Sequence, residues 1–556
     1  MRKTYGTLKK FDADKWVIDK VPPHVSLRIK DVFRQVGTSV RPPFFFKATR
    51  ELEADLKWFM DRYPLLMSIE DRELLEKGAN AHYEKMQVTE HFYSGNYKPS
   101  NLNLKDGMAL ENYQGLARDL FWEVEELLLA DAVGLGKTPT AIASLLRPEM
   151  LPAIVVVQSH LNRQWKKEFK KFTDLNAFII PNGKAKPLPL ADVYIAKYTT
   201  AAKWVDYLTL VGAKTLILDE VQEVRHLDTK KHEACVELYK ASVFHLALSG
   251  SPIYNYGIET WNIYQVIKPS IFPSRDEFIK AWCDYGGRVK DPEALGAYLM
   301  ETRSYLRRTK EDVGSEIPPL NKIIQAVDYE EKAILDMEKR AKVLARNIFQ
   351  GEYIERGMAA RELSIMVRKA TGVSKARSVA AFVRIILESN EPVVLAGWHR
   401  DVYDIWKEEF KDFNPVFYTG TESQNQKDQA KQDFIDRKTN LFIISLRSGV
   451  GLDGLQEVAS YVVFGELDWS PAIHEQVIGR LYRYGQKKQV TAIFCVSDSG
   501  SDPLVIDMNG IKKSQSAGIF DPLRNAVDSQ ESDDTIIKEY ARKLLNKRME
   551  SEDDRD

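Results

Sequence analysis

Short apolar runs alternate with longer amphipathic stretches along most of this chain. Five runs fall in its first half, at residues 127–130, 154–157, 193–196, 216–218 and 244–248. Four more fall in its second half, at residues 392–395, 441–445, 461–464 and 491–496. Continuous apolar runs of this length, separated by helical stretches, predict strands that are buried on both faces of a parallel sheet. We therefore predict an α/β protein with two lobes, each built on a parallel sheet.

The segments outside these runs have other patterns. Residues 1–105 end in a polar, turn-rich stretch at 93–101, and we expect a small α+β domain followed by a linker. Residues 327–375 are rich in charged residues at helical spacing, which predicts a helical protrusion between the lobes. The predicted domains are an accessory domain at 1–105, a first lobe at 106–326, a helical protrusion at 327–375, a second lobe at 376–524 and a tail at 525–556. The tail is predicted to be either a segment that docks on the second lobe or on a protein partner, or a solvated helix.

Composition narrows the class of protein. The chain has 556 residues, of which 44% are hydrophobic and 29% charged, as in soluble globular proteins. No apolar run is long enough for a membrane span or a signal peptide, so we expect a cytoplasmic protein with no membrane partner. The three cysteines lie far apart, which fits a reducing compartment. Because the net charge is −1, a nucleic-acid partner would need a local basic surface.

A phosphate-binding loop follows the first apolar run. Residues 131–138 read Asp-Ala-Val-Gly-Leu-Gly-Lys-Thr. Gly134 and Gly136 would let backbone amides approach a phosphate, Lys137 would reach the β- and γ-phosphates, and the Thr138 hydroxyl would hold Mg²⁺. Asp131 stands where the general pattern has glycine. A tight strand-to-helix turn without a ligand is the alternative interpretation.

Two further groups of residues suit the same chemistry. The apolar run at 216–218 ends in Asp219, a candidate Mg²⁺ ligand, and Glu220, which would orient an attacking water. Arg480 and Arg483 lie three residues apart, and we expect them to share a helix face. Two guanidinium groups on one face suit the oxygens of a phosphoryl group in transfer. We expect the arginines to reach the nucleotide from the second lobe.

Several motifs in order resemble those of a Swi/Snf-type ATPase, a branch of the superfamily-two helicases. The matching segments are residues 111–114 (the adenine-reading Q motif), 131–138 (motif I), 154–169 (Ia), 219–222 (II), 248–253 with Asn255 (III), 305–313 with Pro318 and Pro319 (the signature between lobes), 445–456 (V), 468–471 and 476–486 (VI). Asp131 matches this branch, whereas Gln222 and Tyr482 stand where histidine is common. The resemblance implies two RecA-like lobes that use ATP and Mg²⁺.

The resemblance also assigns site residues. Catalytic roles fall on Lys137, Asp219, Glu220, Arg480 and Arg483. Nucleotide contacts fall on Gln114, Gly134, Gly136, Lys137, Thr138, Gln222 and Gln476, and Mg²⁺ would be held by Thr138 and Asp219. Contacts with DNA, or coupling to it, fall on Gln164, Trp165, Ser249, Gly250, Ser251, Ser445, Ser448, Gly449, Gly451 and Trp469. Trp469 is predicted to be either a packing or a coupling residue.

Finer details resemble the HARP-like annealing-helicase branch. These are residues 368–376 and 465–469, together with 16–33 and 54–63, which resemble its substrate-recognition module. A generic accessory domain is the alternative for the last two. The resemblance implies a monomeric motor that translocates on double-stranded or branched DNA and remodels forks or anneals strands. We expect a bacterial or phage protein acting at the nucleoid; a eukaryotic one would be nuclear.

Three other functions fit parts of the sequence. Motif VI also matches strand-separating DNA or RNA helicases, although the signature at 305–313 and Trp469 favour a duplex translocase. The chain could be the motor subunit of a restriction or defence assembly, which would require a nuclease partner. A nucleotide-gated binding module without turnover is the third, but all five catalytic residues are present.

Overall fold

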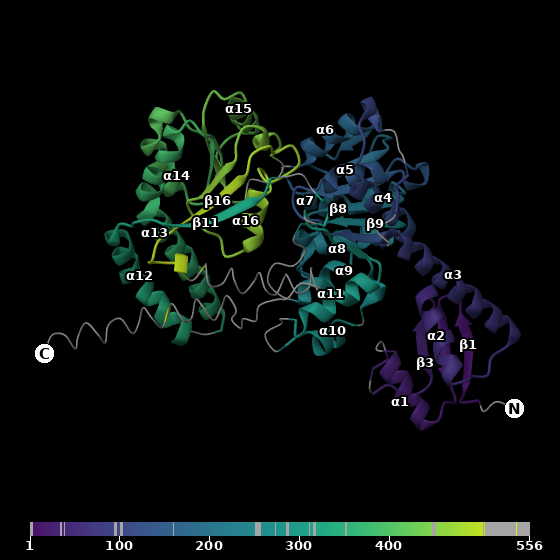
Figure 1. Ribbon diagram of the computed structural model, residues 1–556. Coiled ribbons are helices and arrows are strands. Elements are labelled where there is room, and N and C mark those ends of the chain that lie inside the picture. Colours follow the sequence, from purple (N-terminus) through teal and green to yellow (C-terminus); the bar gives the residue numbers. More distant parts are fainter. Residues whose placement is uncertain are drawn as a thin grey trace.

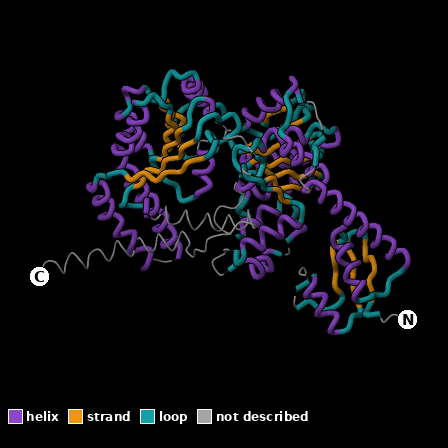
Figure 2. The backbone as a smooth tube through the Cα atoms, viewed as in Figure 1, coloured by secondary structure: helices purple, strands orange, loops and turns teal. Residues whose placement is uncertain are grey.

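The computed structural model describes residues 4–33, 36–37, 39–93, 97–100, 104–159, 161–250, 257–272, 274–284, 289–310, 312–314, 318–350, 353–447, 452–503, 505 and 541. Figure 1 shows three bodies in chain order: an N-terminal module, a first lobe in blue and teal, and a second lobe in green and yellow. The strands of each lobe form a central sheet with helices on both sides (Figure 2). The predicted α/β fold with two parallel-sheet lobes is confirmed.

The N-terminal module is an antiparallel sheet packed against helices. Its strands, in the spatial order β1-β2-β3, are β1 (Thr7–Asp12), β2 (Lys15–Asp19) and β3 (Phe44–Lys47). Its helices are α1 (Pro23–Val32), α2 (Arg50–Arg62) and α3 (Ile69–Tyr93). The core joins alternate strand residues such as Trp16 and Phe44 to Ile29 of α1 and Leu56 of α2. This arrangement matches the small α+β domain expected from the sequence.

Among the described residues, the first lobe is built on seven parallel strands. In spatial order they are β10 (Tyr305–Leu306), β4 (Glu126–Leu129), β9 (Phe244–Leu248), β8 (Thr215–Asp219), β5 (Ala153–Val157), β7 (Val193–Lys197) and β6 (Ala177–Ile179). The helices are α4 (Asn112–Val124), α5 (Lys137–Ser144), α6 (Asn162–Phe172), α7 (Tyr198–Leu210), α8 (Lys230–Lys240), α9 (Ile258–Tyr264), α10 (Arg275–Trp282) and α11 (Pro292–Glu301). Neighbouring residues of β8, Ile217 and Leu218, lie in separate apolar cores, so both faces of the sheet are covered. All five predicted strands are present.

In the part that the structure describes, the second lobe has six parallel strands. In spatial order they are β11 (Leu320–Ala326), β16 (Val490–Val496), β15 (Tyr461–Phe464), β12 (Val393–Gly397), β14 (Leu441–Ser445) and β13 (Val416–Tyr418). Its helices are α14 (Arg400–Glu409), α15 (Gln424–Ile435) and α16 (Pro471–Ile478). The expected lobe boundary after residue 326 is wrong, because β11 pairs along its whole length with β16. This edge strand is mostly exposed and polar, so it has no apolar run to mark it.

The helical protrusion is a hairpin of α12 (Glu331–Gln350) and α13 (Tyr353–Glu388). The two helices share an apolar cluster that includes Ala341 and Leu363. The boundary expected after residue 375 falls inside α13, whose last turns pack against β12 through Val379 and Val383. The protrusion is therefore continuous with the core of the second lobe. Of the expected tail at 525–556, only Ala541 is among the described residues. Across the described part, no helix has both the length and the apolarity to cross a bilayer.

Candidate active site between the lobes

The phosphate loop leaves β4 and ends where α5 begins, at Lys137. Gly134 and Gly136 have φ angles of 94° and 74°, which side chains other than glycine rarely adopt. A Cβ atom at Gly136 would also collide with the Gln114 amide, which donates to the Leu135 carbonyl at 3.1 Å. The loop therefore places backbone amides and a helix N-terminus around one point, as an anion-binding site requires.

Lys137 is held inside this loop. Its Nζ donates to the backbone carbonyl of Asp131 at 2.6 Å. Burial lowers the pKa of the Lys137 ammonium, while the nearby Glu220 and Asp131 carboxylates act in the opposite direction. A lysine with this environment can contact phosphate oxygens as a partly desolvated point charge.

Two arginines of the signature segment at 305–313 hold the phosphate loop through hydrogen bonds. Arg308 forms a two-pronged ion pair with Asp131, with N–O distances of 3.1 and 2.5 Å, and its third nitrogen donates to the Tyr113 carbonyl at 2.5 Å. Arg307 donates to the carbonyls of Ala130 at 2.8 Å and Gly250 at 3.3 Å. The aspartate in place of the usual glycine is thus an anchor for the loop.

The two acidic residues stand at the carboxyl end of β8. An Oδ2 atom of Asp219 accepts a hydrogen bond from Trp165 Nε1 at 2.8 Å, and burial together with Glu220 raises the pKa of Asp219. Glu220 has a φ of 52° and accepts from Gln222 Nε2 at 2.6 Å. The side-chain Oε1 atom of Gln222 accepts in turn from Ser249 Oγ at 2.7 Å. The candidate water-orienting carboxylate is therefore linked to motif III.

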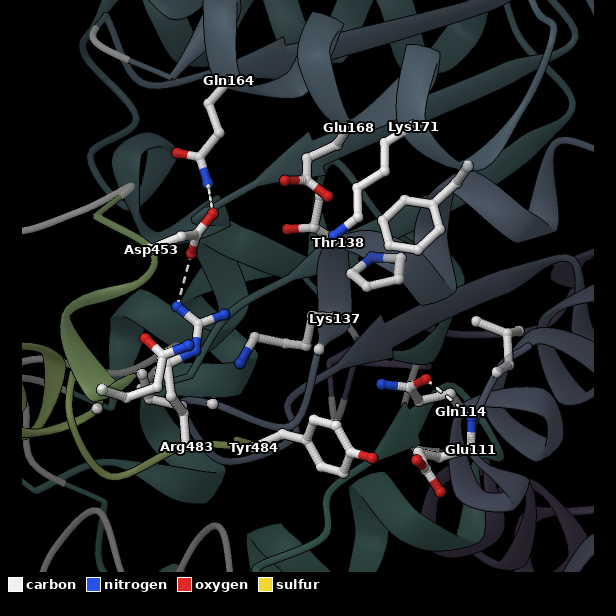
Figure 3. Close-up of a pocket in the computed structure, with 18 of the residues that line it drawn as sticks. Glu111, Gln114, Lys137, Thr138, Gln164, Glu168, Lys171, Asp453, Arg483 and Tyr484 are labelled. Atoms are coloured by element: carbon white, nitrogen blue, oxygen red, sulfur yellow. Dashed lines mark hydrogen bonds and ion pairs between the residues drawn. The ribbon is translucent and has the colours of Figure 1, made fainter. Parts of the chain in front are cut away.

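The two arginines of the second lobe face this site. Arg480 is 9% exposed, and its Nε atom is buried with no hydrogen-bond partner among the described residues. Burial and the neighbouring Arg483 lower the pKa of Arg480 to about 10. Arg483 pairs with Asp453 at 2.6 Å, and Asp453 also accepts from Gln164 of the first lobe at 3.0 Å (Figure 3). A buried guanidinium nitrogen with no protein partner indicates a site for an anionic ligand.

The expectation that these arginines share a helix face is wrong. Helix α16 ends at Ile478, and both arginines lie in the turns that follow it. Directly after the helix, Gly479 lies so close to the phosphate loop that a Cβ atom there would collide with Val133. The turn still brings both side chains into the interlobe cavity.

One cavity of about 510 Å³ collects these groups, a volume suited to a single ligand. Its lining includes Gln114, Gly134, Gly136, Lys137, Thr138, Asp219 and Glu220 from the first lobe, and Arg480 and Arg483 from the second. Both candidate Mg²⁺ ligands, the Thr138 hydroxyl and the Asp219 carboxylate, line this cavity. The residues present therefore fit a nucleoside triphosphate and its divalent cation.

Comparisons with known proteins agree with this geometry. Residues 53–371, more than half of the chain, match the SNF2-related domain, and residues 378–485 match the helicase conserved C-terminal domain. The chain belongs to the SNF2-related family. The Swi/Snf-type resemblance found in the sequence is confirmed, and the helicase C-terminal match covers the part of the second lobe that carries both arginines.

The relatives are longer than this chain. The SWI/SNF-related matrix-associated actin-dependent regulator of chromatin subfamily A-like protein 1 of Xenopus tropicalis is 26% identical over 75% of this chain and 46% of its own length. An uncharacterized ATP-dependent helicase of Mycoplasma pneumoniae is 24% identical over 70% of this chain and 40% of its own. The SWI2/SNF2 ATPase core of Sulfolobus solfataricus in complex with dsDNA gives a TM-score of 0.39 at 20% identity, over 76% of this chain and 96% of that one. This chain thus spans less than half of either curated relative.

Two residues that were expected to contact the nucleotide do not line the interlobe cavity. Gln222 and Gln476 are absent from its described lining, and the Gln222 amide is already engaged by Glu220 and Ser249. Gln164 and Trp165, expected at DNA, line the cavity.

The residues expected to couple to DNA are only partly described. Trp469 donates to Ser364 Oγ on α13 at 3.1 Å and packs between the lobe and the hairpin, which fits the packing alternative. Ser445 is buried at the end of β14, and Gly250 accepts from Arg307. Ser251, Ser448, Gly449 and Gly451, with Asn255, lie outside the described residues.

Sequence reasoning missed several residues of the site. Asp453 lies within motif V but received no role, although it bridges Arg483 and Gln164. Glu168 faces the same cavity from α6, and burial together with Asp453 raises its pKa. Tyr484 is 69% exposed, and its ring points into the cavity between Lys137 and Gln114 in Figure 3. All three lie inside matched motifs, Glu168 in Ia, Asp453 in V and Tyr484 in VI, and only that position could have indicated them.

Proposed function

We propose that this chain is an ATP-driven motor that translocates on double-stranded DNA. The observation that carries the proposal is the interlobe cavity, where Lys137 and Glu220 of one lobe meet Arg480 and Arg483 of the other. A phosphoryl-transfer site divided in this way is complete only while the lobes are together. Turnover of ATP would therefore alternate with opening and closing of the lobes, which is the movement a translocase needs.

Each side chain has a separate part in hydrolysis. The loop amides and Lys137 bind the phosphates, and Glu220 orients the attacking water while Gln222 fixes its carboxylate. Mg²⁺, when bound through Thr138 and Asp219, would neutralise charge on the β- and γ-phosphate oxygens. Arg480 and Arg483 supply positive charge where it builds up in the transition state.

The hydrogen-bond links give a route between the cavity and the rest of the motor. Glu220 is joined through Gln222 to Ser249 of motif III, which family resemblance places toward DNA. Asp453 of motif V holds both Arg483 and Gln164, so one carboxylate connects the two lobes. Movement of either lobe changes this bridge directly.

The choice of duplex DNA over separated strands rests on the SNF2-related match and on the signature at 305–313. The resemblance of residues 16–33 and 54–63 to a HARP-like substrate-recognition module favours branched DNA, with fork remodelling or strand annealing as the outcome. The Mycoplasma relative, which is called a helicase, keeps strand separation as the alternative.

A triplex-displacement assay tests the proposal. A third DNA strand bound to a duplex far from the loading end should be released with ATP, while the duplex itself stays paired. Release of a duplex strand without triplex displacement would support the helicase alternative instead. The Glu220→Gln variant provides the control for hydrolysis, since its phosphate-binding groups are intact.

A further inference from the structure

The sheet of the N-terminal module has one covered and one open face. The register pairs Lys9 with Val17 and Val17 with Phe45, and paired residues point to the same side of a sheet. Trp16 and Phe46, one position along, are buried in the core beneath the helices. Lys9, Val17 and Phe45, called here the Val17 row, therefore lie on the face of the sheet that the helices leave open.

Two aromatic rings stand on this open face. Phe11 and Phe45 are 56% and 49% exposed, and their ring centroids lie 5.2 Å apart in an edge-to-face contact. Val17 is only 3% exposed even though it shares the face, which fits its place beside the Phe45 ring. Exposed phenylalanines gathered at one place on a small domain indicate an interaction surface.

Lysines surround the rings. Lys9 lies in the Val17 row, and Lys15 pairs with Lys47 in the next row, so all three share the open face. None of the three forms an ion pair or a side-chain hydrogen bond within the described structure. Two carboxylates share the face, since Asp12 pairs with Lys15 and Asp19 follows Val17 by two residues, but each accepts a hydrogen bond from a backbone amide: Asp12 from Asp14 N and Asp19 from Lys20 N. The face thus carries two exposed rings and three lysines without a partner among the described residues, whereas its two carboxylates are already engaged by backbone amides.

We propose that this face binds an unpaired stretch of nucleic acid. Bases stack on Phe11 and Phe45, and phosphates lie beside Lys9, Lys15 and Lys47, a combination typical of single-strand binding surfaces. A duplex is excluded as the preferred ligand because its bases are already stacked on one another. The inference rests on the proposed function in one respect only, which is that the unpaired strand belongs to the DNA on which the motor acts.

Binding by the full chain tests the aromatic contribution. The parent should bind a labelled oligothymidylate of about 20 nucleotides, measured by fluorescence anisotropy at fixed salt. The Phe11→Ala, Phe45→Ala double variant should bind it at least about tenfold more weakly, because two stacking contacts are lost. Trp58→Ala is the matched control, since Trp58 is also 56% exposed but lies on α2. Equal affinity of parent and double variant would overturn the proposal.

Crosslinking locates the contact independently. Oligothymidylate carrying 5-iodouracil should form adducts with peptides that contain Phe11 or Phe45, and adducts on the two lobes alone would overturn the proposal. A triple variant, Lys9→Gln, Lys15→Gln and Lys47→Gln, should bind more weakly and lose less affinity when salt is added. ATP turnover on blunt duplex DNA should stay at the parent rate in every one of these variants. If duplex DNA did not stimulate ATP hydrolysis by the parent protein, the proposed motor function would be contradicted. The oligothymidylate binding measurement would still test the proposed single-strand surface.

Discussion

The ammonium group of Lys310 lies 3.3 Å from the centroid of the Tyr482 ring, and the same nitrogen donates to the Tyr482 carbonyl. Lys310 belongs to the signature segment of the first lobe, whereas Tyr482 stands between Arg480 and Arg483 of the second. Lys310 is 7% exposed, so the contact is largely shielded from water. The signature segment therefore contacts both sides of the site. Arg308 holds the phosphate loop, and Lys310 holds the turn that carries Arg480 and Arg483, called here the arginine turn.

Replacing Lys310 should weaken closure of the lobes on ATP. A desolvated cation–π contact is worth about 2 kcal/mol, so we expect Lys310→Gln to lower kcat about tenfold or more. Steady-state turnover on duplex DNA measures the effect, with Lys339→Gln on the exposed face of α12 as control. A parent-like kcat for Lys310→Gln would mean that the arginine turn is positioned without this contact.

Substitutions of Lys137 and of Glu220 should impair different steps, ATP binding in the first case and hydrolysis in the second. Lys137 binds phosphate before the reaction, so Lys137→Ala should weaken ATP binding. Glu220 orients water, so Glu220→Gln should keep ATP bound and unhydrolysed. Equilibrium binding and single-turnover hydrolysis separate the two effects. Hydrolysis at the parent rate by Glu220→Gln would show that another group orients the water.

Arg483 should matter to the transition state more than to binding. Supplying an arginine to such a transition state typically raises the rate about 10³–10⁵-fold, and Arg483→Ala should lose most of this gain. ATP affinity should change much less, because the first lobe holds most of the nucleotide. Asp453→Asn, which removes the charge that pairs with Arg483 at 2.6 Å, should give a smaller loss. Near-parent turnover by Arg483→Ala would contradict closure of the lobes on this residue.

Removing the N-terminal module should leave the motor active. The cut must spare Phe92, which packs in the first-lobe core, and Tyr97 and Ser100, which bond Asp119 at 2.7 and 2.8 Å. Deletion of residues 1 to about 80 should therefore keep turnover on blunt duplex DNA. Preference for forked DNA over blunt duplex should disappear, because contacts to phosphates alone do not distinguish the two. Equal fork preference with and without the module, measured at matched salt, would favour a generic accessory domain.

Local patterns predicted the elements that are buried on both sides. The β8 strand shows this, since each of its five residues is buried and its apolar run is continuous. The β11 strand does not, because it lies at a sheet edge and its side chains are mostly exposed. Its pairing with β16 depends on residues far along the chain. Sequence patterns therefore located the lobes but misplaced the boundary between them.

Motif spacing predicted the catalytic residues but not their surroundings. The helix expected to carry Arg480 ends at Ile478, and the next residue, Gly479, lies against Val133 of the other lobe. Gln222 was assigned to the nucleotide, yet it bridges Glu220 and Ser249, a partner 27 residues away. Such contacts arise only when distant segments meet in the fold, so local spacing gives no sign of them.

A motor that moves on duplex DNA should hydrolyse ATP rapidly only when duplex DNA is bound. Turnover should be measured side by side with blunt duplex DNA, forked DNA, single-stranded DNA, RNA and no nucleic acid, at one salt concentration. The account predicts strong stimulation by both duplex substrates, little by RNA, and none in the Glu220→Gln variant. Turnover that RNA alone stimulates as strongly as duplex DNA, or that needs no nucleic acid, would contradict it.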